Sequence, residues 1–478
     1  MCRWFLRAMK GTVQIALLAS LVSFSWWSDG WGGPTEDVLL ENKQITIDQW
    51  VKLKAEEEKR DAKAMEQSRG ISDVPVRERW YEKISIRGYT QLRYNFTAGN
   101  DLLTSPGDRA IVRNNELSMR RTRLIVSGQP HDRVFVYFQG EFAGLVNNQE
   151  GTGVLRDAYA DIYLTENKAW RIRAGLSKIP FGFDTVQSSQ NRLALDRNDS
   201  TFAAVPNERS LAVFLYYTPP TVRERFRRLV DSGLKGSGDY GMFGVGVFNG
   251  QGIDQRDANK NKHVVFHAAY PHEFSNGQIV QVGMDAYTGQ VVVSTSPVVP
   301  GNSTDGVAIS PQVTNNGNYL DERVAWHLVV FPQPFGFQAE YNIGRGPQLN
   351  DARTAVELGT VQGGYAQLFY NYKCDTYCQN IFPYVRMQEY FGGSKLQSNA
   401  PQNSVRETEL GIEYQFNRAI ELTVAYSWSQ RTSGESATLP ITGSNQTCAS
   451  PASQIACFQT PYQLQSGNLL RFQLQWSF

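Results

Sequence analysis

Large apolar side chains alternate with polar ones along most of the chain after residue 83. The C-terminal segment 470–478 is the clearest case, with single polar residues between Leu470, Phe472, Leu474, Trp476 and Phe478. Successive side chains of a strand point to opposite faces, so this spacing predicts a strand with one apolar and one polar face. An outer-membrane barrel turns the apolar face to lipid and the polar face to its lumen. A chain that ends on such a strand favours the barrel over a soluble sandwich.

The same alternation predicts about sixteen strands. They begin near Lys83, Glu116, Arg133, Leu155, Ala169, Ser210, Tyr240, His263, Gln278, Asp321, Phe335, Gly364, Ile381, Arg406, Ile420 and Asn468. An even count is typical of a single-chain bacterial barrel. The sequence therefore predicts an all-β fold, a transmembrane antiparallel β-barrel of about 16 strands over residues 81–478.

The connections between these strands alternate in length. The odd-numbered ones include long segments at 97–114, 177–209, 290–320 and 431–467. The even-numbered ones include short turns at 128–130, 166–168, 271–277, 332–334 and 416–419. Outer-membrane barrels have long extracellular loops and short periplasmic turns, so the alternation orients the barrel as well as predicting it.

One predicted periplasmic turn, residues 219–238, is too long for this rule. Val222, Phe226, Leu229 and Val230 repeat there at helical spacing, and Thr221 with Glu224 forms a capping-box pattern. The segment predicts a basic helix, which either lies beside the pore mouth or covers an edge of the barrel.

The N-terminal residues differ from the rest. Residues 1–25 combine three basic side chains with the short apolar run 13–24, which predicts a signal peptide and an exported protein. Residues 26–80 form an N-terminal periplasmic segment with a short predicted helix at 46–67. That helix is either a solvated periplasmic helix or a short coiled coil that clusters three barrels. We therefore expect the protein to reside in the outer membrane of a Gram-negative-type bacterium.

Composition agrees with a barrel and indicates no cofactor. The mean hydropathy of −0.40 is polar, while 22 Tyr, 25 Phe and 10 Trp suffice for two interfacial girdles. In an oxidising compartment, Cys374 with Cys378 and Cys448 with Cys457 predict local disulfides. Neither pair matches a zinc pattern, so no metal, cofactor or nucleic-acid partner is expected.

The direction of the lumen charges follows from strand parity. The early strands point a set of arginines inward, namely Arg87, Arg93, Arg121, Arg123, Arg171 and Arg173. Arg120 has the wrong parity unless a bulge lies there. The late strands point acids inward, namely Glu340, Glu407, Glu409, Glu413 and Glu421, and Asp157 and Asp161 are inward acids in the basic half. Arginines gathered on one wall predict a track for hydrated anions.

The connection 177–209 is long and rich in charge, with Lys178, Arg192, Asp196, Arg197 and Asp199. Folded inward, it would narrow the channel that a sixteen-strand barrel otherwise leaves open. Folded outward, it would be an ordinary surface loop. The residues alone leave both arrangements open.

Several stretches of the first half resemble the phosphate-selective porin O and P family. They are Ile86-Arg87-Gly88-Tyr89-Thr90-Gln91-Leu92-Arg93-Tyr94, Met119-Arg120-Arg121-Thr122-Arg123-Leu124, Leu155-Arg156-Asp157-Ala158-Tyr159, Arg171-Ile172-Arg173-Ala174-Gly175 and Pro180-Phe181-Gly182-Phe183 with Ser188-Ser189. The resemblance implies a homotrimer of sixteen-stranded barrels in outer-membrane lipid, with the third loop folded inward and a pore lined by arginine. It carries a pore-lining arginine pair onto Arg120 and Arg121, and a constriction-loop lysine onto Lys178. Tyr89 stands where the characterised channels have an arginine.

The resulting expectation is a porin that passes small anions, phosphate among them, by passive diffusion. The predicted anion-binding residues are Arg87, Arg93, Arg120, Arg121, Arg123, Arg171, Arg173 and Lys178, and no catalytic residue is expected. One alternative is a general porin for small hydrophilic solutes. Another is an outer-membrane barrel enzyme, against which the five scattered histidines count because they do not recur with Ser and Asp in one set of loops.

Overall fold

The structure is a computed structural model in which the chain divides into two compact units, Met1–Arg79 and Trp80–Phe478. It describes residues 83–98, 115, 117–146, 149–253, 256–295, 313–351, 354–374, 377–434 and 462–478, together with residues 56 and 59. Nearly all described residues belong to the second unit. The predicted signal peptide lies outside the described residues, as does the predicted helix 46–67 except at residues 56 and 59.

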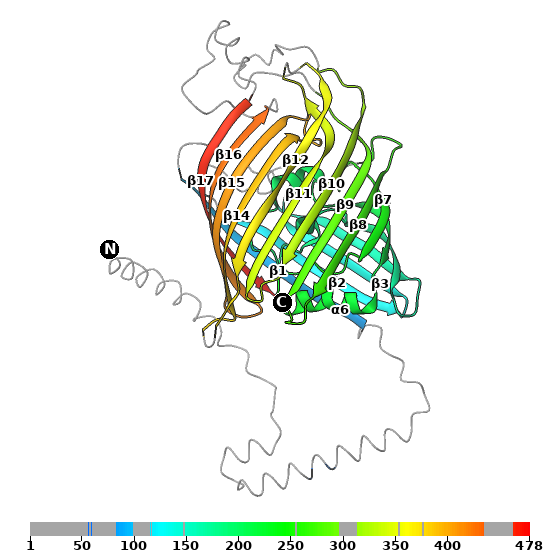
Figure 1. Ribbon diagram of the computed structural model, residues 1–478, viewed down its shortest axis with the longest axis vertical. Coiled ribbons are helices and arrows are strands. Elements are labelled where there is room, and N and C mark those ends of the chain that lie inside the picture. Colours follow the sequence, from blue (N-terminus) through cyan, green and yellow to red (C-terminus); the bar gives the residue numbers. More distant parts are fainter. Residues whose placement is uncertain are drawn as a thin grey trace, which may run out of the picture. The chain divides into compact units, whose positions relative to one another are not determined.

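The second unit is a closed antiparallel β-barrel (Figure 1). Its first strands are β1 (Ile84–Ala98), β2 (Leu117–His131), β3 (Val134–Val146), β4 (Gln149–Tyr163), β5 (Trp170–Lys178), β6 (Arg209–Tyr217), β7 (Phe243–Phe248), β8 (His263–Glu273) and β9 (Ile279–Val292). The others are β10 (Asn318–Val330), β11 (Phe335–Leu349), β12 (Val356–Tyr370), β13 (Tyr372–Lys373), β14 (Asn380–Gly393), β15 (Gln402–Gln415), β16 (Ile420–Gly434) and β17 (Tyr462–Ser477).

The barrel closes because β1 pairs with both β2 and β17. The two-residue β13 follows β12 directly, and both pair with β14, so together they fill one position in the barrel wall. The wall therefore has the predicted sixteen strand positions. The largest differences from the predicted starts are at β12, which begins at Val356 rather than near Gly364, and at β17, which begins at Tyr462 rather than near Asn468.

The two faces of the strands separate apolar from polar side chains as predicted. Outward residues such as Ile86, Leu211 and Phe335 are 66%, 59% and 70% exposed. Inward residues such as Gln91 and Arg93 are fully buried inside the barrel. Large apolar side chains exposed all round a closed sheet fit a lipid environment, since backbone groups are satisfied within the barrel and its surface is apolar.

Register shifts interrupt this alternation on the first strands, and at two of these β-bulges the extra residue is an arginine. On β2, Met119 and Arg121 pair with consecutive residues of β1, which leaves Arg120 without a partner in the register. On β4, Leu155 and Asp157 pair with consecutive residues of β3, which leaves Arg156 unpaired in the same way. A bulge changes the direction of the side chain at the extra residue, and it accounts for the wrong parity of Arg120.

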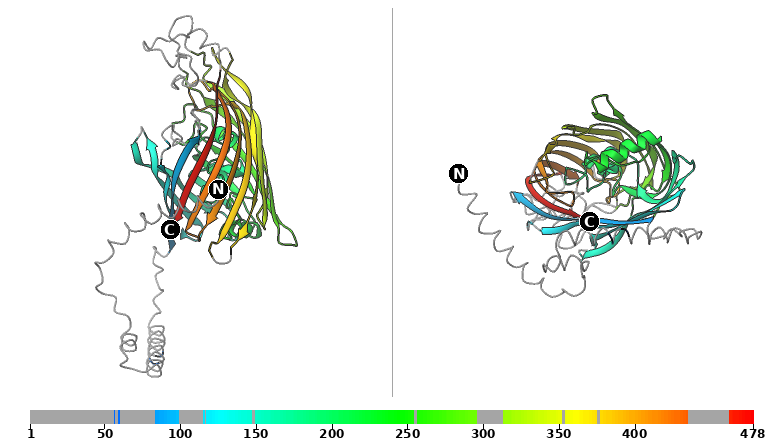
Figure 2. Two further views of the ribbon diagram at one scale, coloured as in Figure 1. Left: turned by 90° about the vertical axis from the view of Figure 1, so that its left-hand side faces the viewer. Right: turned by 90° about the horizontal axis from the view of Figure 1, so that it is seen from below.

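Helix α6 (Pro220–Asp231) occupies the long periplasmic turn, as predicted. Seen from below, it lies within the outline of the barrel (Figure 2). Its apolar side chains turn inward, with Val222 and Phe226 packed near Ala269, and Leu229 in a cluster with Ile279. The predicted capping box is wrong, because the helix begins at Pro220 and its N-cap residue makes no side-chain hydrogen bond. No helix in the described ranges is long and apolar enough to cross a membrane.

The cysteines agree with the prediction where they are described. Cys374 and Cys378 form a disulfide in the turn between β13 and β14. Cys448 and Cys457 lie outside the described residues.

Candidate functional site in the lumen

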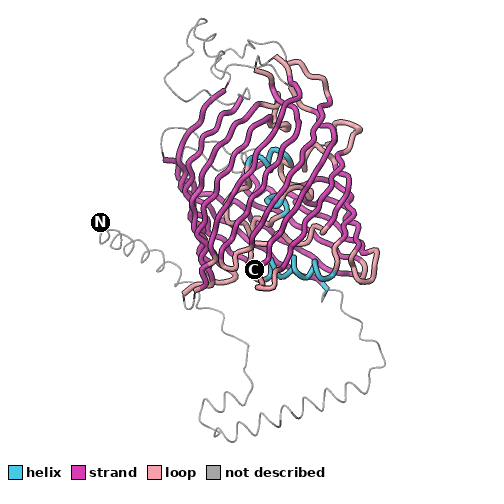
Figure 3. Tube along the Cα trace, in the orientation of Figure 1, coloured by secondary structure: helices cyan, strands magenta, loops and turns pink. Residues whose placement is uncertain are grey.

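Residues 179–208, between β5 and β6, fold into the barrel and are called the inward loop. The loop carries α4 (Phe183–Val186) and α5 (Asp199–Ala204), both drawn inside the barrel in Figure 3. It reaches several parts of the wall: Gly182 N donates to Asp285 Oδ2 of β9 at 2.9 Å, the hydroxyls of Ser189 and Tyr89 of β1 are 2.7 Å apart, and Asp199 N donates to Gln388 Oε1 of β14 at 3.0 Å. It therefore crosses the lumen, and the inward arrangement is confirmed.

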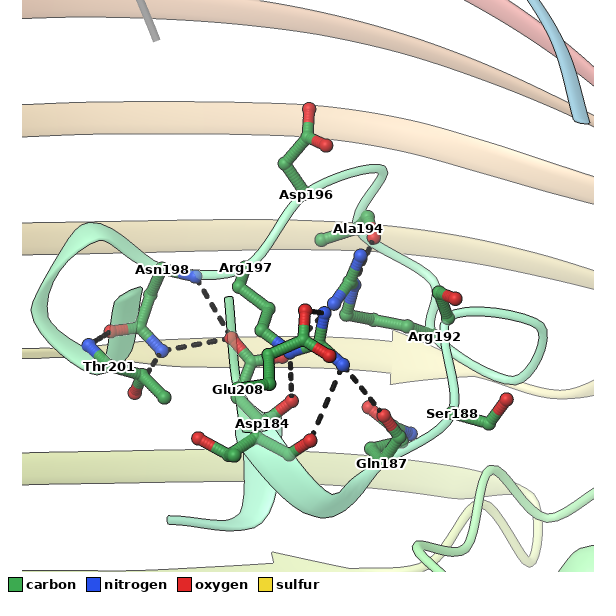
Figure 4. Close-up of polar contacts among 12 residues, drawn as sticks. Asp184, Gln187, Ser188, Arg192, Ala194, Asp196, Arg197, Asn198, Thr201 and Glu208 are labelled. Carbon is green, nitrogen blue, oxygen red and sulfur yellow. Dashed lines mark hydrogen bonds and ion pairs between the residues drawn. The ribbon is translucent and has the colours of Figure 1, made fainter. Parts of the chain in front are cut away.

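The inward loop is held in shape by its own polar groups (Figure 4). Arg197 donates to the carbonyls of Asp184 and Gln187 at 2.8 and 3.0 Å, and Arg192 donates to that of Ala194 at 2.9 Å. The side chain of Asn198 accepts from Thr201 N at 2.9 Å and so caps α5. Burial lowers the pKa of Arg192 to about 10, which leaves it charged at neutral pH. The loop is thus a folded element of its own.

Asp184 fixes the loop to the late strands. Its Oδ2 accepts from Arg386 of β14 at 3.0 Å, and from both the backbone and the side chain of Asn198 at 2.9 Å. Burial alone would raise the pKa of the Asp184 carboxyl, but the nearby arginines hold it below its ordinary value. The carboxylate is therefore charged and fully used in holding the loop.

Asp196 stands on the other side of the loop, pointing away from the groups that hold the loop together (Figure 4). Its carboxylate forms ion pairs with Arg93 of β1 at 3.0 Å, Arg120 of β2 at 3.3 Å and Arg471 of β17 at 2.6 Å. Burial would raise its pKa, and the three arginines outweigh this and hold the pKa well below the usual range. Three guanidinium groups thus share one loop carboxylate, although Arg471 also contacts Glu409.

Most other arginines of the lumen are also paired with carboxylates. Arg123 contacts Glu141 at 2.6 Å, Arg173 contacts Asp161 at 2.7 Å, Arg171 contacts Asp239 at 2.8 Å, Arg209 contacts Asp157 at 3.0 Å and Arg431 contacts Asp199 at 2.7 Å. Side-chain exposure in these pairs ranges only from 3% to 19%. The predicted arginine wall is therefore largely a lattice of ion pairs.

Three arginines of β1, β2 and β4 form no ion pair with any described residue: Arg87, Arg121 and Arg156. Arg87 is exposed at the lower end of β1. Arg121 donates to Gln91 Oε1 at 2.8 Å and is buried. Arg156 is half-buried at its bulge, and its charge interacts with the inward charges of Arg123, Arg209 and Glu208. The wall of β1–β4 thus presents positive charge that no carboxylate matches.

The family comparison fits this geometry. The model of the phosphate-selective porin O and P family matches residues 91–449, which is most of the chain. The chain belongs to this family. With its closed barrel and apolar outer face, it is an outer-membrane porin with a β-barrel channel fold.

Several solved structures are similar to this chain over most of its length. They include the channel DcaP of Acinetobacter baumannii at 14% identity, which covers 83% of this chain and 97% of that one with a TM-score of 0.47. OmpF of Salmonella typhi in complex with daunomycin has 13% identity, the same coverage and a TM-score of 0.47. The trimer form of Vibrio cholerae OmpT has 10% identity and covers 83% and 99%, with a TM-score of 0.46. A search among curated proteins finds no match.

The predicted site residues of this porin divide by their surroundings. Within the described part of the chain, Arg87 and Arg121 have no carboxylate partner. Carboxylate partners are present at the other arginines, namely Arg93, Arg120, Arg123, Arg171 and Arg173. Lys178 is buried, and its Nζ donates to the carbonyls of Val186 and Gln187 at 3.1 and 2.8 Å. The Lys178 amino group therefore binds the inward loop and does not point into an open channel.

Sequence reasoning missed two features of the lumen. The first is Arg156, because strand parity alone turns it outward and only the bulge turns it in. The second is a set of inward histidines, with His267 2.5 Å from Asp285 and His263 3.1 Å from Asp321. Asp285 accepts from Gly182 N, and Lys395, which contacts Asp321, donates to the Ala204 carbonyl at 2.7 Å. Both histidines therefore support carboxylates that connect the barrel wall to the inward loop. Among the described residues no cluster of His, Cys, Asp and Glu is able to hold a metal.

Proposed function

We propose that this porin passes small anions, phosphate and other oxyanions among them, by passive diffusion along the wall of β1–β4. The observation that carries the proposal is the unmatched charge of Arg87, Arg121 and Arg156. An arginine already paired with a carboxylate offers little net attraction, whereas an unpaired one attracts anions and binds their oxygens with a planar fork. The family description points to the same class of solute.

Arg156 is the residue on which the proposal depends most directly. It is half-buried, so an ion reaches it, and the arginines beside it, Arg123 and Arg209, are paired with Glu141 and Asp157. The acids beside it, Glu141 and Glu208, are already bound by Arg123 and Arg197. The local excess of positive charge therefore stays with Arg156.

Arg156→Gln tests this in planar bilayers, with the reversal potential measured across a potassium chloride gradient. A unit charge about 10 Å away in water changes the energy of an ion by ~0.4 kcal/mol, about twofold in occupancy. Because anions lose this attraction while cations lose a repulsion, we expect the anion-to-cation permeability ratio to fall about fourfold at low salt. Added phosphate should block chloride current in the wild type and less so in the variant.

Arg133→Gln is the matched control. Arg133 lies at a turn, where its ion pair with Glu166 is 3.6 Å long and its side chain is 50% exposed. Its removal should leave the reversal potential unchanged. A wild-type channel without anion preference would refute the proposal.

A non-selective porin for small hydrophilic solutes is the second candidate. It is favoured by the many ion pairs of the lumen, since paired charges keep a channel wet without selecting a sign. Weak selectivity and the absence of phosphate block would identify it.

We also propose that three copies assemble in outer-membrane lipid, as the family resemblance implies. Native mass spectrometry of the detergent-purified protein tests this, and a monomer under mild detergent would contradict it.

A further inference from the structure

A cavity of about 260 Å³ lies where the inward loop, the end of α6 and the lower ends of the late strands meet. It is separate from the free arginines of β1–β4. Its lining includes the amide side chains of Asn191, Gln379, Asn380 and Asn417. Side-chain amides dominate this lining, in contrast to the ion pairs above the loop.

Several of these amides keep hydrogen-bonding groups unused. The side chains of Asn191 and Gln379 have no hydrogen-bond partner among the described residues. Asn380 donates to Gln415 at 2.9 Å through its nitrogen, so its oxygen is left. Asn417 accepts two backbone N–H groups through its oxygen, so its nitrogen is left. The cavity therefore offers both donors and acceptors.

The charges around the cavity nearly balance. Lys235 contacts the buried Glu413 at 2.5 Å, which neutralises both groups. Asp231 is paired with Arg227 at 3.1 Å, and the other two charged residues of the lining, Arg418 and Glu421, are of opposite sign. A bare anion therefore gains little from such a site.

The cavity is also held in a fixed shape. Gln190 donates to the Ser477 hydroxyl at 2.9 Å, and Gln475 donates to the Gln190 carbonyl at 3.3 Å. Gln187 of the inward loop donates to the Lys235 carbonyl at 2.7 Å, which ties the loop to the segment after α6. A site formed before its ligand arrives loses little entropy on binding.

We propose that this cavity binds a hydroxyl-rich solute of about monosaccharide size near the periplasmic end of the channel. A hydroxyl group both donates and accepts, which is the pattern that free amides match. The volume is slightly below the roughly 300–1,000 Å³ of sites for drug-sized ligands, which suits a single sugar ring. This binding goes beyond anion diffusion and does not depend on it.

The test measures current fluctuations of single channels in planar bilayers while a neutral hexose is added on the periplasmic side. The wild type should show transient, concentration-dependent interruptions. Asn191→Leu and Gln379→Leu replace amides of the cavity with apolar side chains of similar size. Loss of a hydrogen bond at the site should weaken the apparent affinity about three- to tenfold in each variant.

Gln397→Leu is the control, since Gln397 is an exposed amide of the segment between β14 and β15. It should bind the hexose like the wild type. Interruption by hexose that the cavity variants weaken and the control does not would support the site. No interruption, equal interruption in all variants, or interruption by organic ammonium ions alone would overturn it. Because the hexose carries no charge, these outcomes are independent of the reversal potential that tests anion selectivity.

Discussion

The wall of β1–β4 and the wall of β9–β17 use charge in different ways. On β9–β17 the inward charges bind the inward loop, as Arg386 binds Asp184 and Arg431 binds Asp199. On β1–β4 some arginines bind carboxylates, but Arg87, Arg121 and Arg156 do not. Paired charges build structure, whereas unpaired charges remain available to ions.

This difference explains why a count of lumen arginines says little about selectivity. An arginine whose guanidinium is bound by a carboxylate contributes a dipole rather than a net charge. The position of the acids, rather than the number of arginines, therefore decides which part of the wall attracts anions. Three changes test the comparison, beginning with the wall that holds the loop.

Asp184→Ala should have the largest effect. It leaves Arg386 buried without its carboxylate and removes the acceptor of Asn198. Breaking a buried ion pair by removing one partner costs about 3–5 kcal/mol. We expect a loss of this size in the free energy of unfolding, measured by urea denaturation in detergent, and larger, noisier single-channel currents as the loop loosens.

Glu166→Gln provides the control for this loss. It removes the 93% exposed partner of Arg133 in a periplasmic turn, where solvent screens the pair. Stability and conductance should not change. A similar loss in both variants would mean that the pairs on the loop have no special role.

Gly182→Ala should have a smaller effect at the start of the loop. Gly182 has φ of +80°, and a Cβ there would lie 2.4 Å from Glu340 Oε1. Glu340 accepts from Asp184 N at 2.9 Å and from the Thr201 hydroxyl at 2.6 Å, so it has little room to move. We expect a loss of about 1–3 kcal/mol from overpacking, beyond the backbone strain.

Gly238→Ala is the control for the contact with Glu340 in the same denaturation experiment. Gly238 has φ of +88°, and a Cβ there would meet nothing within 4 Å. Both substitutions carry the strain of a positive φ, about 1–2 kcal/mol, so only their difference reports the clash with Glu340. Equal losses in the free energy of unfolding would show that the Glu340 side chain moves away from the new Cβ at no cost in stability.

The fold was predictable because a barrel repeats one rule along the whole chain. Alternation predicted the sixteen wall positions and the inward set of residues, which the structure confirms. The exceptions arise where the rule is interrupted. Arg120 and Arg156 turn inward because each is the extra residue of a bulge, and a bulge depends on the pairing of two strands that one strand's sequence does not reveal.

The site was less predictable than the fold because its contacts are distant in sequence. The sequence placed Arg93 and Asp196 in the lumen and its loop, but their 3.0 Å contact joins residues 103 positions apart. The same holds for Asp184 and Arg386, whose 3.0 Å contact joins residues 202 positions apart. Parity assigns a face to each residue, whereas ion pairing depends on how the loop folds across the barrel.

Asp196→Asn is a test of ion permeation, where the expected energy of ~0.4 kcal/mol per ion is the smallest of the three effects. The substitution keeps the volume and one acceptor oxygen but removes the carboxylate charge that Arg93, Arg120 and Arg471 share. The net charge beside β1 and β2 thereby rises by one unit. By the same estimate of ~0.4 kcal/mol per unit charge at about 10 Å, the anion-to-cation permeability ratio should rise about fourfold at low salt. Asp132→Asn, at an exposed turn, is the control and should leave the ratio unchanged. A ratio that falls, or one that stays unchanged while Arg156→Gln lowers it, would show that the charge of Asp196 does not act on the ions that pass along β1–β4.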